Sequence, residues 1–236
     1  MRDPTPRLAP HEFWQKVHPA GTFDLAPPHG FHDLYPATFA DGRQIALPIR
    51  VLPEGDAAVA SLIVNQASFA VVDALGDALA DLAKPHEPEV IVGVPTLGLP
   101  LAEGVARRLG HERMVALGTS RKFWYDEALS RPLVSITSPG QGKRLYLDPR
   151  MLPLVAGRRV AVVDDVISTG ASIDAVLGLL ALGGVTPVVV LAGMLQGERW
   201  RTTLSFAGHL DRVAGALATP RFRRREDDGG GWEPAV

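Results

Sequence analysis

Cysteine is absent from the 236 residues of this sequence. This absence excludes a disulfide framework, a thiolate metal site and a cysteine nucleophile, and it suits a protein of a reducing compartment. Basic residues are not in excess either, since 24 lysines and arginines stand against 26 acids and the net charge is −2. The charge balance therefore points to neither nucleic acid nor an anionic membrane as a partner.

Long apolar runs and the motifs of several enzyme classes are also missing. No apolar stretch approaches the length of a membrane span, and the proline-rich start lacks the order of a signal peptide, so we expect a soluble, cytoplasmic protein. The sequence has no Gly-Lys-Ser/Thr phosphate loop, no Gly-x-Ser-x-Gly elbow and no Gly-x-Gly-x-x-Gly fingerprint. These absences count against kinase, hydrolase and dehydrogenase functions, and the histidines form no metal-binding pattern.

The most informative segment present is residues 159–172. Its residues 160–163 are continuously apolar, which is typical of a strand covered on both faces of a parallel sheet. Asp164 and Asp165 then stand at the carboxyl end of that strand, where open α/β sheets bind ligands. The small residues that follow are Ser168, Thr169, Gly170, Ala171 and Ser172. Because such a backbone can approach a phosphate closely and lead into a helix, the segment predicts a site for a phosphorylated sugar.

The same segment resembles the signature of the type I phosphoribosyltransferases, in which an apolar strand, two acids, two variable residues, Thr-Gly and small residues follow one another. The resemblance implies an α/β fold with a parallel sheet flanked by helices, a small N-terminal hood and a mobile hairpin insertion. It implies a site for 5-phosphoribosyl-1-pyrophosphate (PRPP), with Asp164 and Asp165 as catalytic residues on the ribose hydroxyls and residues 168–172 around the 5-phosphate. Magnesium would be held through PRPP, with no direct protein ligand.

A second loop consists of Pro95, Thr96, Leu97 and Gly98, after a strand predicted over residues 89–94. By resemblance this is the pyrophosphate-binding loop. Many family members carry Arg or Lys where this chain has Leu97, so contacts to pyrophosphate would come from backbone amides and Thr96. An ordinary strand-to-helix turn is an equally good explanation of the loop.

Positive charge for the leaving pyrophosphate must then come from elsewhere. By resemblance to adenine and xanthine phosphoribosyltransferases, we assign this catalytic role to Arg121 and Lys122. The resemblance also assigns Asn65 and Leu195 to the nucleobase, although an asparagine before a helix more often caps that helix.

We expect the chain to have three parts. They are a proline-rich, partly ordered arm (1–30), a phosphoribosyltransferase domain (31–219, with the hood mainly in 31–61 and the core in 62–200), and a flexible solvated tail (220–236). In the hood, Asp41 and Gly42 predict a hairpin turn. Apolar spacing predicts a helix over residues 67–83, and the polar excursion over residues 121–142 is expected to be mobile.

The resemblance thus implies a purine phosphoribosyltransferase of the adenine or xanthine type, which uses PRPP and a nucleobase, releases pyrophosphate and forms a homodimer. Two alternatives stay open. A regulatory protein could bind PRPP without catalysis, an alternative favoured by Leu97. Alternatively, the acceptor could be a pyrimidine base such as orotate or uracil.

Overall fold

A parallel sheet forms the centre of the protein, which is described by a computed structural model over residues 8–133, 144–206, 208–226 and 230–235. Its strands follow the spatial order β11-β10-β9-β5-β6, and all neighbouring pairs are parallel. They are β5 (Val90–Gly93), β6 (Val115–Ala116), β9 (Val160–Ile167), β10 (Val189–Gln196) and β11 (Val213–Thr219). The predicted parallel α/β sheet is therefore confirmed.

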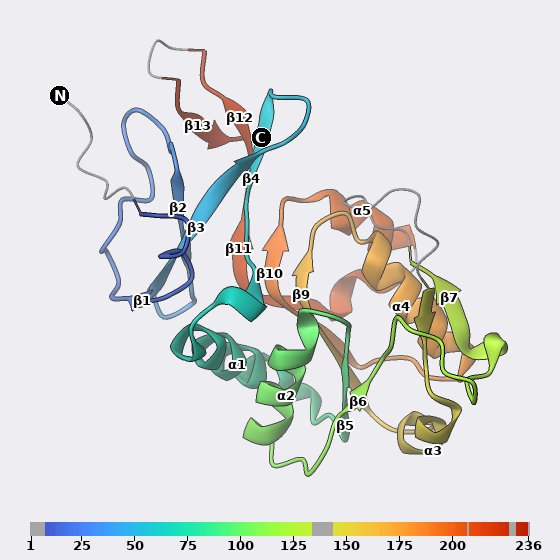
Figure 1. Ribbon diagram of the computed structural model, residues 1–236. Coiled ribbons are helices and arrows are strands. Elements are labelled where there is room, and N and C mark those ends of the chain that lie inside the picture. The colour runs from blue at the N-terminus through green and yellow to red at the C-terminus, as the bar shows by residue number, and fades with distance from the viewer. Residues whose placement is uncertain (1–7, 134–143, 207, 227–229, 236) are drawn as a thin grey trace.

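Helices cover both faces of this sheet (Figure 1). One face carries α1 (Phe69–Ala83) and α2 (Gly98–Arg108), and the other carries α3 (Leu152–Val155), α4 (Ala171–Leu182) and α5 (Arg199–Phe206). The short 3₁₀ turns are η1 (Val64–Gln66), η2 (Lys84–His86), η3 (Glu127–Leu129), η4 (Pro149–Met151) and η5 (Leu210–Arg212). The helix predicted over residues 67–83 is confirmed as α1.

Two apolar clusters, one on each side of the sheet, explain the unbroken apolar run in β9. Ala161 and Val163 belong to the cluster beneath α1 and α2, whereas Val160 and Val162 belong to the cluster beneath α4 and α5. All four side chains are fully buried. Alternate residues of a strand point to opposite faces, so a strand buried on both faces has no polar positions until it ends.

A second, antiparallel sheet forms the hood. Its order is β1-β3-β4-β12-β13, and β2 pairs with residues 44–48 of β3, next to the part that pairs with β4. The strands are β1 (Val17–His18), β2 (Leu34–Thr38), β3 (Gln44–Val51), β4 (Ala57–Ala60), β12 (Arg221–Arg224) and β13 (Trp232–Pro234). The predicted hairpin is confirmed, because β2 and β3 pair from Thr38 and Gln44 onward and Gly42 turns the chain with φ of 87°.

The expectation of a flexible tail over residues 220–236 is wrong. β12 pairs with β4, and β13 pairs with β12, so the end of the chain supplies two strands of the hood (Figure 1). The hood consequently extends well beyond residues 31–61. Arginines dominate the sequence of β12, but Phe222 alternates with them and is fully buried. A single apolar residue between charged neighbours is a weak sequence signal for a strand.

The N-terminal arm also packs on the hood from residue 8 onward. Phe13 and Trp14 are buried, and the Trp14 indole N–H donates to the carbonyl oxygen of Ser61 at 2.8 Å. β1 pairs with β3, which fixes the following part of the arm. These contacts place the arm against the segment that connects the hood to the core.

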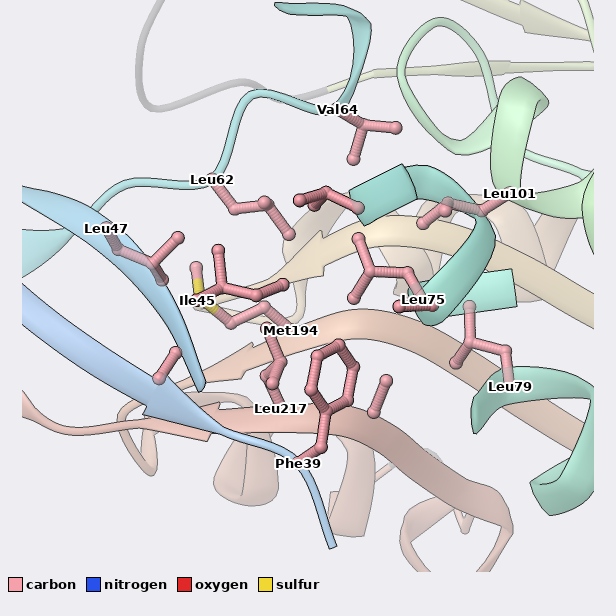
Figure 2. Packing of buried hydrophobic residues seen from close by; sticks show 14 of the residues in the cluster. Phe39, Ile45, Leu47, Leu62, Val64, Leu75, Leu79, Leu101, Met194 and Leu217 are labelled. Carbon is pink, nitrogen blue, oxygen red and sulfur yellow. The ribbon is translucent and has the colours of Figure 1, made fainter. Parts of the chain in front are cut away.

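Hood and core share one apolar cluster, seen in Figure 2. Ile45 and Leu47 of β3 pack together with Leu75 of α1 and with Met194 and Leu217 of the central sheet. All five side chains are buried to at least 99%. The hood therefore lies on the core through a continuous apolar contact and forms a fixed wall beside the carboxyl ends of β10 and β11.

The polar excursion is only partly described, because residues 134–143 lie outside the described residues. Its described part contains η3 and β7 (Ser130–Pro132), which pairs antiparallel with β8 (Arg144–Tyr146). The expected mobility of the excursion stays a prediction. Within the described part of the chain, no helix has the length and apolar character required to cross a membrane.

We predict that Phe222→Ala destabilises the whole protein. The Phe222 ring packs edge to face on Phe31 and Tyr35, with centroid distances of 5.9 and 5.1 Å. Removing a fully buried phenylalanine should lower the free energy of unfolding by about 3–5 kcal/mol, as measured by urea denaturation. The matched control is Phe206→Ala, because Phe206 is 90% exposed. Equal unfolding free energies of Phe222→Ala and the wild type would restore the interpretation of residues 220–236 as a solvated tail.

Candidate functional site

The candidate site lies where the strand order reverses. Connections run outward from β5 to β6 on one side and from β9 to β10 and β11 on the other, so β5 and β9 are neighbours at a topological switch point. Crevices at the carboxyl ends of such strands are the usual ligand sites of open α/β sheets. The loop of residues 95–98 follows β5, and residues 164–172 end β9 and lead into α4. The two sequence-predicted loops therefore meet at one edge of the sheet.

Gly98 brings the two loops into direct contact. It is the first residue of α2, and a methyl group placed on it would lie 2.8 Å from the Asp164 Cα and 3.0 Å from Asp164 Oδ1. The backbone N–H of Val94 also donates to the carbonyl oxygen of Val163 at 3.0 Å. Only glycine fits at position 98 without displacing the acid. The positive end of α2 consequently lies against Asp164.

The acid pair is withdrawn from solvent. Asp164 is 5% exposed, and its Oδ1 accepts the backbone N–H of Asp165 at 2.8 Å. Burial raises the pKa of Asp164 well above the usual range of a carboxyl, and the neighbouring Asp165 carboxylate adds to this effect. Burial likewise raises the pKa of Asp165. A ligand that donates hydroxyl groups to these oxygens, or brings positive charge near them, would stabilise the ionised pair.

The small residues after β9 form a turn that opens α4. Gly170 has φ of 84° and precedes the first helical residue, Ala171. The N–H of Ala171 lies 3.4 Å from the Thr169 hydroxyl, and the Thr169 carbonyl oxygen accepts the hydroxyl of Thr203 at 2.7 Å. Backbone N–H groups at the start of a helix have no intrahelical acceptors, and the helix dipole favours an anion there. This turn is therefore suited to a phosphate group.

In the loop after β5, Leu97 does not offer a polar contact. It precedes α2 and packs against the apolar cluster of the hood side, whereas Thr96 is exposed. The peptide bond between Pro95 and Thr96 is cis. Polar contacts from this loop to a ligand would come from its backbone and from Thr96.

Among the described residues, no contact connects Arg121 or Lys122 to the acid pair. Both are exposed, and Arg121 Nε lies 3.4 Å from Glu127 Oε2 within its own segment. The segment is attached to the core at its aromatic residues. The Trp124 indole N–H donates to Asp148 at 3.3 Å, and the Arg150 guanidinium lies 4.6 Å from the centroid of the Trp124 ring. Hydrogen bonds, above all from Arg150, lower the pKa of Asp148 to about 2.

The two predicted base-binding residues have different surroundings. Asn65 is exposed in η1, and it does not cap α1, because the hydroxyl of Ser68 accepts the N–H of Val71 in that role. Leu195 pairs with Ile167, the residue before the small-residue turn, and it lines a cavity of about 270 Å³. The other lining residues are Gly197, Glu198, Trp200, Arg201, Ala218, Thr219 and Pro220.

Sequence reasoning missed two polar residues of this region. The Thr219 hydroxyl is buried at the cavity and has no hydrogen-bond partner among the described residues. Thr203, on α5, contacts the small-residue turn. Neither α5 nor β11 was predicted, so no pattern in the sequence singled these threonines out. In the described ranges, no three His, Cys, Asp or Glu side chains gather as a metal site would require.

Comparisons with known proteins agree with this geometry. Residues 61–202 match the family model described as phosphoribosyl transferase domain. The chain is 31% identical over 132 residues to the orotate phosphoribosyltransferase of Halorhodospira halophila, covering 56% of this chain and 54% of that one. It is 36% identical over 103 residues to the transcriptional regulator GfcR of Archaeoglobus fulgidus, covering 44% and 45%. The chain thus spans about half the length of both relatives.

A solved structure with a similar fold is that of the APRTase from Giardia lamblia in complex with 9-deazaadenine. The TM-score is 0.53 and the sequence identity 20%, with 63% of this chain and 80% of that chain covered. This similarity concerns the fold. The family match covers the acid pair, both loops and more than half of the sequence, which confirms the resemblance seen in the motifs. The chain belongs to the phosphoribosyl transferase domain family.

Proposed function

We propose that this protein is a PRPP-dependent phosphoribosyltransferase that transfers phosphoribose to a ring nitrogen of a purine and releases pyrophosphate. The observation that carries the proposal is the meeting of two loops at the carboxyl ends of β5 and β9. Gly98 at the start of α2 lies against Asp164, and Asp164 and Asp165 lead directly into the turn that opens α4. A sugar with a phosphate at one end and a pyrophosphate at the other needs anion-binding groups on both sides of hydroxyl-binding acids, and this order provides them.

The 5-phosphate would bind at residues 168–172, where free N–H groups and the dipole of α4 favour an anion. Asp164 and Asp165 would accept hydrogen bonds from the 2- and 3-hydroxyls of the ribose. Their negative charge would stabilise the positive charge that develops on the ribose as the bond to pyrophosphate breaks. Both acids stand on β9, so the fixed strand positions them before the donor binds.

Pyrophosphate would lie at residues 95–98 and the start of α2. The loop contains no cationic side chain, so Arg121 and Lys122 would have to supply positive charge. The oxygens of the donor are suitable ligands for Mg²⁺, which would neutralise part of the pyrophosphate charge when bound. The loop itself would orient the leaving group with its backbone and with the exposed Thr96.

We place the purine at the ends of β10 and β11. The cavity there begins with Leu195, beside the residue that precedes the phosphate-binding turn, and Thr219 is one of its lining residues. The one cationic side chain among the lining residues, Arg201, is paired with Glu198. A lining whose one cation is already paired suits a neutral, flat ring better than orotate, which carries a carboxylate. Asn65 remains a second proposed base contact.

Two other functions are favoured by specific observations. The named relative from Halorhodospira halophila is an orotate phosphoribosyltransferase, which favours a pyrimidine acceptor. The relative from Archaeoglobus fulgidus is a transcriptional regulator, and the apolar Leu97 in the loop after β5 favours a protein that binds PRPP without turnover.

Incubating the protein with PRPP, Mg²⁺ and single bases should separate these functions. We expect pyrophosphate release with adenine, xanthine, hypoxanthine or guanine. Release with orotate or uracil alone would replace the purine by a pyrimidine. Tight PRPP binding in calorimetry without release for any base would describe a sensor rather than an enzyme.

Asp164→Asn should make the protein more stable and less able to bind PRPP. The amide keeps the acceptor for the N–H of Asp165 but removes a buried charge. Because the folded-state pKa of Asp164 is raised, the wild type loses stability as pH rises from the ordinary range of a carboxyl through the folded value. The variant lacks this loss. Its Tm should exceed that of the wild type at pH 7, by about 2–4 °C per kcal/mol relieved, and the difference should shrink towards pH 4.

The matched control for this stability measurement is Asp211→Asn, since Asp211 is exposed. Its Tm should stay close to that of the wild type, because an exposed side chain makes little contribution to stability. A lower Tm of Asp164→Asn at pH 7, combined with unchanged PRPP affinity in calorimetry, would remove Asp164 from the site.

Arg121→Ala should affect turnover more than binding, because the negative charge on pyrophosphate grows as the bond breaks. We expect kcat with a purine to fall by roughly ten- to a hundredfold, with a smaller change in the KM for PRPP. Arg107→Ala is the control, since Arg107 is exposed on α2 and pairs with Glu103 at 2.7 Å. A rise in KM at constant kcat would show that Arg121 contributes to donor binding alone.

A further inference from the structure

Helix α5 packs firmly beside the phosphate-binding turn. Trp200 is 2% exposed, and its indole N–H donates to the carbonyl oxygen of Gly197 at 2.9 Å. Leu204, one turn further along, is fully buried in the cluster beneath α4. These contacts attach the helix to the core on either side of Thr203. The side chain between them, Thr203, therefore has a fixed position.

Thr203 makes the contact from α5 to the turn. Its hydroxyl donates to the carbonyl oxygen of Thr169 at 2.7 Å. A methyl group placed on Gly170 would lie 3.0 Å from the Thr203 Cβ and 3.3 Å from the Trp200 Cα. The turn therefore lies close against α5, the positive φ of Gly170 favours glycine there, and a hydrogen bond holds the backbone in place.

The geometry of the peptide bond connects this contact to the phosphate. The Thr169 carbonyl and the Gly170 N–H belong to one planar trans peptide, so they point in opposite directions. A hydrogen bond that holds the carbonyl towards α5 directs the Gly170 N–H away from α5. Glycine tolerates many backbone angles, and without this bond the peptide would be free to rotate and present its oxygen to an anion.

We propose that Thr203 is a positioning residue for the 5-phosphate, which it serves by orienting the peptide between Thr169 and Gly170. This inference rests on the function proposed above. Thr203 itself does not touch the phosphate. Its hydroxyl keeps a donor, rather than an acceptor, aimed at the ligand.

The test compares Thr203→Val, which replaces the hydroxyl by a methyl group, with Thr203→Ser, which keeps it. The control is Thr202→Val, because the neighbouring Thr202 is exposed on the same helix. Calorimetry uses two probes: ribose 5-phosphate, which reports on the turn, and inorganic pyrophosphate with Mg²⁺, which reports on the loop after β5. Thermal melts verify that each variant is folded, and Thr203→Ala replaces the valine variant if that variant is not.

We expect Thr203→Val to lower the affinity for ribose 5-phosphate by about tenfold, as the loss of one well-aligned hydrogen bond would. Pyrophosphate affinity should stay unchanged, and Thr203→Ser and Thr202→Val should bind both probes like the wild type. In turnover with PRPP, KM should rise by a similar factor while kcat changes less. A general structural effect would weaken both probes equally.

Three results overturn the proposal. If Thr203→Val binds ribose 5-phosphate as tightly as the wild type does, the positioning role is contradicted and the proposed function is not. Equal loss of both probes contradicts the positioning role as well, because the effect would then not be specific to the turn. A wild-type protein that binds neither PRPP nor ribose 5-phosphate overturns the proposed function, and the positioning role with it.

Discussion

The burial of two adjacent carboxyl groups at the end of β9 is the constraint on which the rest of the site depends. Asp164 is almost fully buried, and the first residue of α2 lies directly against it. Burying a charge without a partner is unfavourable, so both pKa values are raised. The two carboxyl groups stay buried because the strand β9 and the close approach of α2 together fix their position. Such stored destabilisation is common at functional sites, where a ligand relieves it.

The hood, which packs on the core, is the second structural feature that matters for the site. Its strands come from both ends of the chain, and its inner face joins the cluster beneath α1. Gln196, at the end of β10, also donates its side-chain N–H to the carbonyl oxygen of Ala60 at 2.7 Å. The hood is thus attached to the core by apolar packing and by a hydrogen bond. Described segments near both ends of the chain, which the sequence predicted to be a partly ordered arm and a flexible tail, thus contribute strands to the hood.

Much of the fold could be predicted because its signals are local. The apolar run before Asp164 and the spacing over residues 67–83 each determine an element from a few neighbouring residues. The turn at Gly42 is of the same kind, since glycine is favoured at its positive φ. For the same reason the acid pair and the small-residue turn stood out, and the structure places both at the switch point of the sheet.

The remainder depends on contacts between distant segments. β12 is a strand because Phe222 meets Phe31 and Tyr35, a pairing that the arginine-rich sequence around it conceals. Helix α5 is short and buries only Trp200 and Leu204, so its apolar periodicity is weak. The cap of α1 is Ser68 rather than Asn65, which lies three residues earlier. Only the observed start of the helix distinguishes these two candidates. The role of Thr203 arises from a contact across 34 residues of sequence.

The central claim is that one crevice at the switch point holds a phosphorylated ribose, and a crystal structure with ribose 5-phosphate tests it most directly. The account predicts phosphate density within hydrogen-bond distance of the backbone N–H groups of residues 169–172, with ribose hydroxyls on Asp164 and Asp165. Phosphate bound elsewhere in well-ordered density, with the acid pair facing only solvent or protein, would contradict it.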